Sequence, residues 1–257
     1  MIPPTPLGSD GSAAPASFAI PSRTDTVVDS IKQMITTGVL KAGSRLPVEK
    51  DLALELGVSR SSLREGVRAL CSMGVLETRQ GDGTYVTSLD LNRLLAPMGF
   101  LVDLQELSDM SHVQAVRRVL ETEAAGRAAI AISDEALGEA EGILASVDSL
   151  VSTGAPSNYE AFIEADIQFH RVVSHAAGNP ALEALIEALS SRTLRARTWR
   201  AITEQGVLAI THGEHRAILQ SLRIHDPDGA RLRMGTHLLA VQDFMHDHPD
   251  VESPDQG

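Results

Sequence analysis

The feature that most restricts the fold is the spacing of apolar residues from about residue 89 to residue 246, which is helical throughout. No segment there shows the strict alternation that marks a half-buried strand. Helix breaks are expected at Ser133, 152–156, 178–180, Gly206 and 226–227, where Ser, Gly, Asn, Asp and Pro residues gather. The intervening segments predict an all-helical bundle of six or seven helices, at about 89–103, 107–132, 134–152, 158–177, 180–203, 205–224 and 227–246.

The preceding segment, residues 23–88, mixes helix and strand signals. One helix is expected to end near Gly38, a second to cover about 48–56, and a third to cover about 60–73 after the N-cap Ser59. Two short strands at about 75–79 and 84–87 flank a glycine-containing turn. This order is that of a winged helix-turn-helix domain. The predicted fold is therefore mainly α, with an N-terminal winged helix-turn-helix domain and a C-terminal helical bundle.

The two ends of the chain have a different composition. The first 22 residues are rich in Pro, Gly, Ser and Ala, and residues 249–257 are rich in Pro and acidic residues. Neither segment can bury enough apolar surface to offset the entropy of ordering. We therefore predict disordered tails at 1–22 and 249–257, with the winged helix-turn-helix domain at 23–88 and the helical domain at 89–248 between them.

The charge is distributed unevenly between these domains. The chain has 22 basic and 34 acidic residues, a formal charge of −12, yet residues 23–90 hold nine of each sign. Only the small N-terminal domain can therefore approach a polyanion readily. The single cysteine, Cys71, excludes an intrachain disulfide and a multi-cysteine zinc site. With no apolar run near about 20 residues and no export signal, we expect a soluble cytoplasmic protein without a membrane partner.

The expected third helix has two distinct faces. Its apolar positions recur at i, i+4 and i+7: Leu63, Val67 and Leu70. A second face carries arginines at i, i+4 and i+8: Arg60, Arg64 and Arg68. Arginine can donate two parallel hydrogen bonds to guanine O6 and N7, and a helix N-terminus with free N–H groups suits phosphate. The arrangement favours a helix that reads DNA in the major groove over a merely solvated surface.

Four polar residues in the helical domain fall on apolar faces of different helices. Asp166 and His170 are i, i+4 and about 40° apart around one helix. His215 and His237 each share a stripe with apolar residues on a further helix. A single histidine in this setting is usually a hydrogen-bonded core residue, but a carboxylate and three imidazoles together favour a divalent metal site. Zinc suits this donor set best, with nickel, manganese or iron as alternatives.

The remaining histidines are weaker candidates. His212, one turn before His215, is the main competitor for a place in the metal site, and we expect it at the surface or at a cap. The same is expected of His175, His225, His246 and His248.

Residues 44–86, SRLPVEKDLALELGVSRSSLREGVRALCSMGVLETRQGDGTYV, closely resemble the DNA-binding domain of the GntR family of bacterial regulators. The resemblance implies that Arg60 and Arg64 contact DNA and that Gln80 and Gly81 form the wing tip in the minor groove. Contacts nearer to the DNA backbone are implied for Lys50, Ser59, Ser61 and Ser62. One departure is Val48, where the family usually has Ser, Ala or Thr, so the cap of the second helix is expected to be weaker.

Residues 92–246 resemble the ligand-binding domain of the FadR subfamily, the FCD type. The matching segments are VRRVLETEAAGRAA (116–129), EADIQFHRVV (164–173), GNPAL (178–182), GEHRAILQSL (213–222) and DPDGARLRMGTHL (226–238). The resemblance implies that Asp166, His170, His215 and His237 bind a metal, which argues against a long acyl thioester as effector.

The same resemblance implies an effector pocket beside the metal, in which Arg117 pairs with the effector's carboxylate. Arg117 and Glu121 are i, i+4, so a plain ion pair within one helix is an equally acceptable interpretation.

These observations together predict a regulator rather than an enzyme. We expect a repressor that binds a pseudo-palindromic operator in double-stranded DNA as a homodimer, controlled by a small organic acid at the metal site. A metal-dependent hydrolase is one alternative, since three histidines and an aspartate can activate water. An architectural DNA binder without an effector is the other.

Overall fold

The structure, a computed structural model, describes residues 22–95, 97, 110–153, 159–204 and 206–248. The chain divides into two compact units at the bond between Thr87 and Ser88. The predicted tails at 1–22 and 249–257 lie outside the described residues, except for Ser22.

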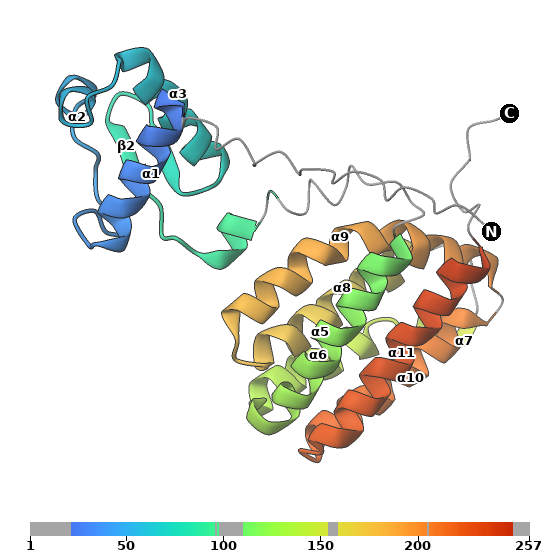
Figure 1. The fold of residues 1–257 in the computed structure, drawn as a ribbon. Coiled ribbons are helices and arrows are strands. Elements are labelled where there is room, and N and C mark those ends of the chain that lie inside the picture. The colour runs from blue at the N-terminus through green and yellow to red at the C-terminus, as the bar shows by residue number, and fades with distance from the viewer. Residues whose placement is uncertain (1–21, 96, 98–109, 154–158, 205, 249–257) are drawn as a thin grey trace, which may run out of the picture. The chain divides into compact units, whose positions relative to one another are not determined.

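The first unit contains three helices and a two-stranded antiparallel sheet (Figure 1). The elements are α1 (Arg23–Thr36), α2 (Glu49–Glu55), α3 (Arg60–Ser72), β1 (Leu76–Arg79) and β2 (Gly83–Val86). In the sheet Leu76 lies opposite Val86, and Arg79 lies opposite Gly83. The winged helix-turn-helix order predicted from the sequence is confirmed, and the element ends agree to within a residue or two.

Local chemistry explains the position of α3. The Ser59 hydroxyl accepts a hydrogen bond from the Ser62 amide at 3.1 Å, so α3 begins with the expected N-cap. Val48 gives α2 no side-chain cap. A Cβ at Gly66 would lie 2.5 Å from Val27, so α1 and α3 approach closely only because this position is glycine. The close approach fixes α3 against α1 and leaves its opposite face exposed.

The second unit is all-helical, as predicted. Its helices are α5 (Met110–Ala131), α6 (Asp134–Ala145), α7 (Asp148–Thr153), α8 (Tyr159–Ala176), α9 (Pro180–Thr203), α10 (Val207–Arg223) and α11 (Pro227–Asp247). One expectation was wrong in detail: the helix expected over 134–152 is divided into α6 and α7. Ser146 and Val147 separate the two, and Val147 is buried at the bend. Of the helix expected over 89–103, residues 91–95 are helical, and most of the remainder lies outside the described residues.

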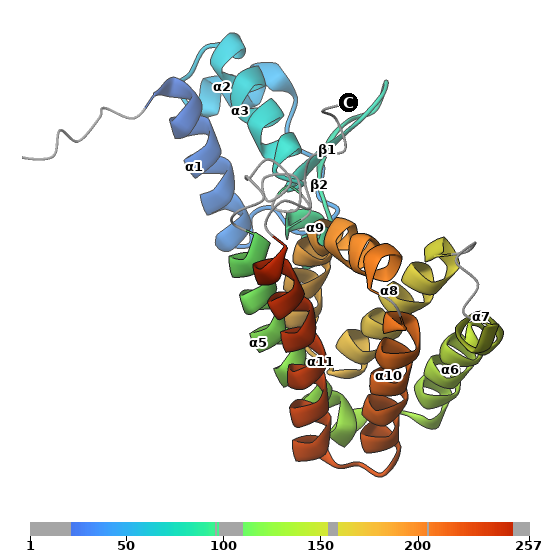
Figure 2. The ribbon, with the colours of Figure 1, turned by 90° about the vertical axis from the view of Figure 1, so that its right-hand side faces the viewer.

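Close packing in this unit rests on small residues of α5. Figures 1 and 2 show α5 and α11 side by side along their length. Ala125, Ala128 and Ala129 of α5 are fully buried in the main core, which also contains Phe169 and Met234. Because small side chains let these helices approach, the inward faces of α8, α10 and α11 meet around a common centre. Among the described residues, no helix is both long enough and apolar enough to cross a membrane.

Candidate metal centre and nucleic-acid interface

The four residues predicted to bind a metal come together in the centre of the helical unit. Asp166 and His170 lie on α8, His215 on α10 and His237 on α11. One ligand atom from each residue lies within 4.8 Å of all the others, and all four side chains are buried. Three helices therefore supply one compact donor set.

The distances fit ligands of a shared ion. Nε2 of His237 lies 3.3 Å from Nε2 of His170 and 3.3 Å from Nε2 of His215. Oδ1 of Asp166 lies 3.4 Å from Nε2 of His215. Two ligands at zinc bond lengths of about 2.0–2.1 Å in tetrahedral geometry are separated by about 3.3–3.4 Å. Three Nε2 atoms and one carboxylate oxygen at these separations could hold a divalent transition metal.

Two of the imidazoles are supported on the side away from this centre. Nδ1 of His237 is hydrogen-bonded to Glu214 at 2.8 Å, and Nδ1 of His170 is bonded to the buried Glu121. Metal-binding histidines commonly have such a partner, which fixes the orientation of the ring.

Asp166 is oriented in a similar way. Its Oδ2 pairs with the buried Arg197 of α9, which leaves Oδ1 facing the imidazoles. Burial alone would raise the pKa of the Asp166 carboxyl, but charged neighbours, with the Arg197 guanidinium first among them, outweigh burial and hold the pKa below its ordinary value. Asp166 is therefore ionised at neutral pH, as a metal ligand must be.

Two of the imidazoles, those of His215 and His237, are shifted toward their neutral form. Burial lowers the pKa of His215 well below its ordinary value, and the neighbouring His237 lowers it further. Burial also lowers the pKa of His237, although Glu214 opposes this shift. Neutral imidazole is the form that binds a metal, so burial prepares both side chains for that role.

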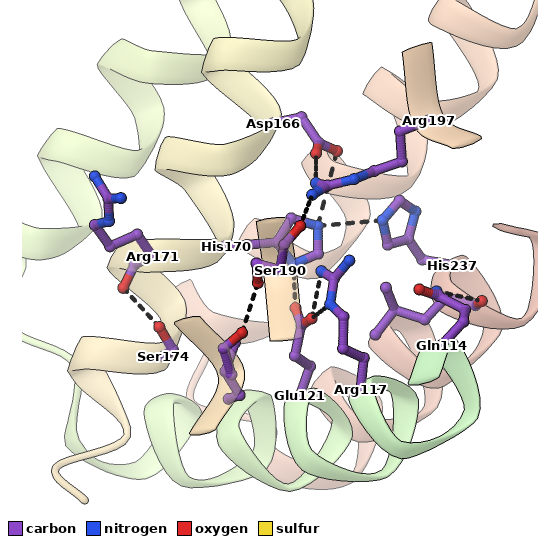
Figure 3. Close-up of polar contacts among 12 residues, drawn as sticks. Gln114, Arg117, Glu121, Asp166, His170, Arg171, Ser174, Ser190, Arg197 and His237 are labelled. Atoms are coloured by element: carbon purple, nitrogen blue, oxygen red, sulfur yellow. Dashed lines mark hydrogen bonds and ion pairs between the residues drawn. The ribbon is translucent and has the colours of Figure 1, made fainter. Parts of the chain in front are cut away.

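A cavity of about 180 Å³ lies beside the cluster. Its lining includes Arg117, His170, Ser174, Ser190 and Arg197. Figure 3 shows these residues together with their polar partners, among them Glu121 and Asp166. Both arginines are buried, and each is paired with a buried carboxylate. A small anion in this cavity would therefore meet two guanidiniums and one edge of the metal cluster.

Arg117 and Glu121 form the ion pair expected from their spacing, but the pair is not a surface one. Their side chains are 1% and 2% exposed, and Arg117 Nη2 lies 2.5 Å from Glu121 Oε1. Burial raises the pKa of Glu121 when taken alone, but Arg117 and His170 together hold the pKa below its ordinary value. The pair is part of the site rather than a contact on a solvated helix face.

The other histidines lie outside the cluster. The expectation that His212 lies at the surface or at a cap was wrong: it is buried within α10, where its Nε2 is hydrogen-bonded to Asp148 at 2.8 Å. His175 is exposed and contacts Glu183, and Nδ1 of His225 lies 2.8 Å from the Ala129 carbonyl oxygen. His246 and His248 lie at the end of α11.

The first unit presents its arginines on one exposed face of α3. Arg60, Arg64 and Arg68 are exposed, whereas Leu63 and Leu70 are buried beneath them. Arg64 Nε donates a hydrogen bond to Glu49 of α2 at 2.8 Å.

The other residues expected to contact DNA lie near this face or on the wing. Lys50, Ser61, Gln80 and Gly81 are exposed, and Gly81 has the positive φ of a tight turn at the wing tip. Ser59 and Ser62 are occupied with capping α3, and Ser62 is partly buried.

Sequence reasoning missed the partners of the candidate site residues. Glu121 appeared only as the partner of Arg117. Arg197 and Glu214, which contact candidate metal ligands, and Glu49, which contacts Arg64, were not predicted. Each contacts its partner through tertiary packing, since 49 positions separate Glu121 from His170 and 31 separate Asp166 from Arg197. For Glu214 the available signal was its place directly before the candidate ligand His215.

The first unit is a winged helix-turn-helix domain that presents arginines from α3, and the second is a helical domain with a buried donor set and a cavity. This combination is that of a ligand-responsive transcriptional regulator. Residues 23–86 match the model for bacterial regulatory proteins of the gntR family, and residues 112–240 match the FCD domain. The chain belongs to the GntR family and carries an FCD effector-binding domain.

Characterised relatives agree with this assignment. The chain is 28% identical over 227 residues to the HTH-type transcriptional repressor NanR of Escherichia coli K12, covering 86% of this chain and 84% of NanR. It is 30% identical over 217 residues to the HTH-type transcriptional regulator LutR of Bacillus subtilis, covering 82% of this chain and 96% of LutR. The chain is 27% identical to Streptococcus agalactiae GntR, whose solved structure matches it with a TM-score of 0.60 over 86% of this chain and 99% of the other. These relatives are regulators, and the protein is a transcriptional regulator rather than an enzyme.

Proposed function

We propose that this regulator is a repressor whose operator binding is controlled by a small carboxylic acid bound at a metal site in the FCD domain. The observation that carries the proposal is the cavity of about 180 Å³ lined by both His170 and Arg117. One candidate metal ligand and one buried guanidinium therefore line the same small cavity.

The proposed ligands of the metal are Asp166, His170, His215 and His237, and zinc fits this donor set best. A divalent cation at this position would supply a Lewis-acidic centre for a carboxylate or hydroxyl oxygen of the effector. Nickel, manganese and iron accept the same nitrogen and oxygen donors.

The effector is proposed to be a small organic acid whose carboxylate pairs with Arg117. A guanidinium presents a planar fork that matches a carboxylate, and burial strengthens such a pair by excluding water. Arg197 lines the same cavity and supplies a second positive charge. The cavity volume of about 180 Å³ supports a compact acid rather than a long acyl chain as the effector.

On the DNA side, Arg60 and Arg64 are the proposed base-reading residues, with Lys50, Ser59, Ser61 and Ser62 near the phosphates and Gln80 and Gly81 in the minor groove. We propose a homodimer, because two recognition helices about 34–36 Å apart would read successive major grooves of a pseudo-palindrome. The repressor role is supported by the name of the relative NanR.

The effector acts in this proposal by favouring one of two states that differ in DNA affinity. A ligand shifts such an equilibrium only as far as its affinities for the two states differ. The helical unit must therefore bind the acid more tightly in one state than in the other.

A thermal-shift screen of zinc-loaded protein against small carboxylic acids tests the effector site. We expect a defined acid to raise the melting temperature of the wild type and to have a much smaller effect on Arg117→Ala. If every acid that stabilises the wild type stabilises Arg117→Ala equally, Arg117 is not part of the effector site.

A further inference from the structure

We propose that Glu121 is a positioning residue for the metal site: it holds the His170 ring so that Nε2 points at the metal, and Arg117 in turn fixes Glu121. The inference rests on the proposed metal site. It assigns a role to a buried carboxylate that is not itself one of the four candidate ligands.

The two oxygens of Glu121 have separate partners. Oε1 accepts hydrogen bonds from Nε and Nη2 of Arg117, at 2.7 and 2.5 Å. Oε2 is bonded to Nδ1 of His170, as Figure 3 shows. Two donors from one rigid guanidinium hold Oε1 in place, and the contact with Nδ1 of His170 holds Oε2.

This contact decides which nitrogen of His170 carries the proton. In a neutral imidazole one nitrogen donates and the other accepts. An ionised carboxylate is only an acceptor, so Nδ1 must carry the proton and Nε2 must present its lone pair. Nε2 of His170 is the atom that lies 3.3 Å from Nε2 of His237. The carboxylate therefore selects the tautomer that a metal ion needs.

His237 offers a comparison within the same site. Glu214 contacts Nδ1 of His237 at 2.8 Å, but the Glu214 side chain is 26% exposed, against 2% for Glu121. Water can replace the Glu214 contact when that side chain is lost, whereas it reaches Nδ1 of His170 much less readily. We therefore expect the metal site to depend more on Glu121 than on Glu214.

The test is the zinc dissociation constant of the full chain, measured by competition with a chelator. Glu121→Leu removes the acceptor, and we expect zinc to bind about 10–100-fold more weakly than to the wild type. Glu121→Gln keeps an acceptor oxygen and is expected to restore part of that loss. Glu123→Gln, two positions along α5, changes a carboxylate that is 45% exposed and is the matched control, with a change within about twofold.

Glu121→Leu leaves the Arg117 charge buried without its partner and could fail to fold. The double variant Arg117→Met/Glu121→Leu removes both charges, and it is expected to show the same weakening of zinc binding. If either folded variant binds zinc as tightly as the wild type, the positioning role is contradicted. If the wild type itself binds no zinc, the proposed metal site is wrong, so the two failures are distinguishable.

The tautomer of the His170 ring can be measured separately, and it would not change if Glu121 had a purely structural role. Imidazole ¹⁵N shifts in metal-free protein, with the His170 signal assigned by its loss in His170→Asn, should show the Nδ1–H form in the wild type. The Nε2–H form should appear in whichever of the two leucine variants folds. Retention of the Nδ1–H form there would overturn the inference.

Discussion

Acidification of the metal-free protein from pH 6.5 to pH 5.5 is expected to destabilise the helical unit by about 1–2 kcal/mol. His215 and His237 are both buried with lowered pKa values, primarily because burial penalises the charged imidazolium. The unfolded chain takes up protons at these residues below its ordinary histidine pKa of about 6.5, whereas the folded chain takes up fewer at the same pH. The unfolded state therefore binds more protons, and stability falls as the pH falls.

The magnitude follows from the two imidazoles. A histidine that stays neutral when folded and titrates normally when unfolded loses about 1 kcal/mol of stabilisation between these two pH values. His215 supplies about 1 kcal/mol, and His237, whose pKa is also lowered, brings the total to between about 1 and 2 kcal/mol. Asp166 and Glu121 have lowered pKa values, so their contribution is lost only near and below the ordinary carboxyl pKa of about 4. Between pH 6.5 and pH 5.5 the change in stability therefore comes from the imidazoles and not from these two carboxyl groups.

The single tryptophan makes the assay specific for this unit. Trp199 lies in α9, so its fluorescence reports denaturation of the helical unit and not of the DNA-binding head. Urea titrations at the two pH values give the difference in unfolding free energy. The double variant His215→Gln/His237→Gln should lose most of the pH dependence, and exposed His175→Gln should keep it. An unfolding free energy that does not change across the window in the wild type would refute the reasoning.

Three further predictions concern binding. Arg60→Ala should cost about 1–3 kcal/mol of discrimination between operator and random DNA; competition binding checks this, and unchanged specificity would remove Arg60 from base reading. Glu49→Ala should release Arg64 from its 2.8 Å hydrogen bond and lower operator specificity by less than Arg64→Ala does, in the same assay; a loss as large as that of Arg64→Ala would contradict a merely supporting role. His170→Ala should lose most bound metal in elemental analysis, and retention of full stoichiometry would count against the site.

The periodicity of the sequence was sufficient to predict most of the helices and strands and the faces that they turn inward. The stripe of Leu63, Val67 and Leu70 predicted which face of α3 packs and which face presents arginines. The break between α6 and α7 was not predicted, because the sequence around Ser146 and Val147 contains no Gly or Pro to mark it. A bend of this kind arises from tertiary packing of Val147 rather than from local propensity.

For the site, helical spacing placed Asp166, His170, His215 and His237 on inward faces, but it could not show which helices face each other. The resemblance to the FadR subfamily supplied that step. The carboxylate–imidazole contact of Glu121 and the ion pair of Arg197 depend on the packing of α5 and α9 against α8. No periodicity within one helix contains this information, so such partners become visible only in three dimensions.

Operator affinity measured by fluorescence anisotropy tests the central claim most directly, using an operator selected from random DNA and the acid found in the thermal-shift screen. The zinc-loaded wild type should change its operator affinity at least about fivefold when the acid is added, the lower end of typical coupling between sites. His170→Ala should bind the operator without responding to the acid. An equal response in wild type and His170→Ala would contradict control of DNA binding through the metal site.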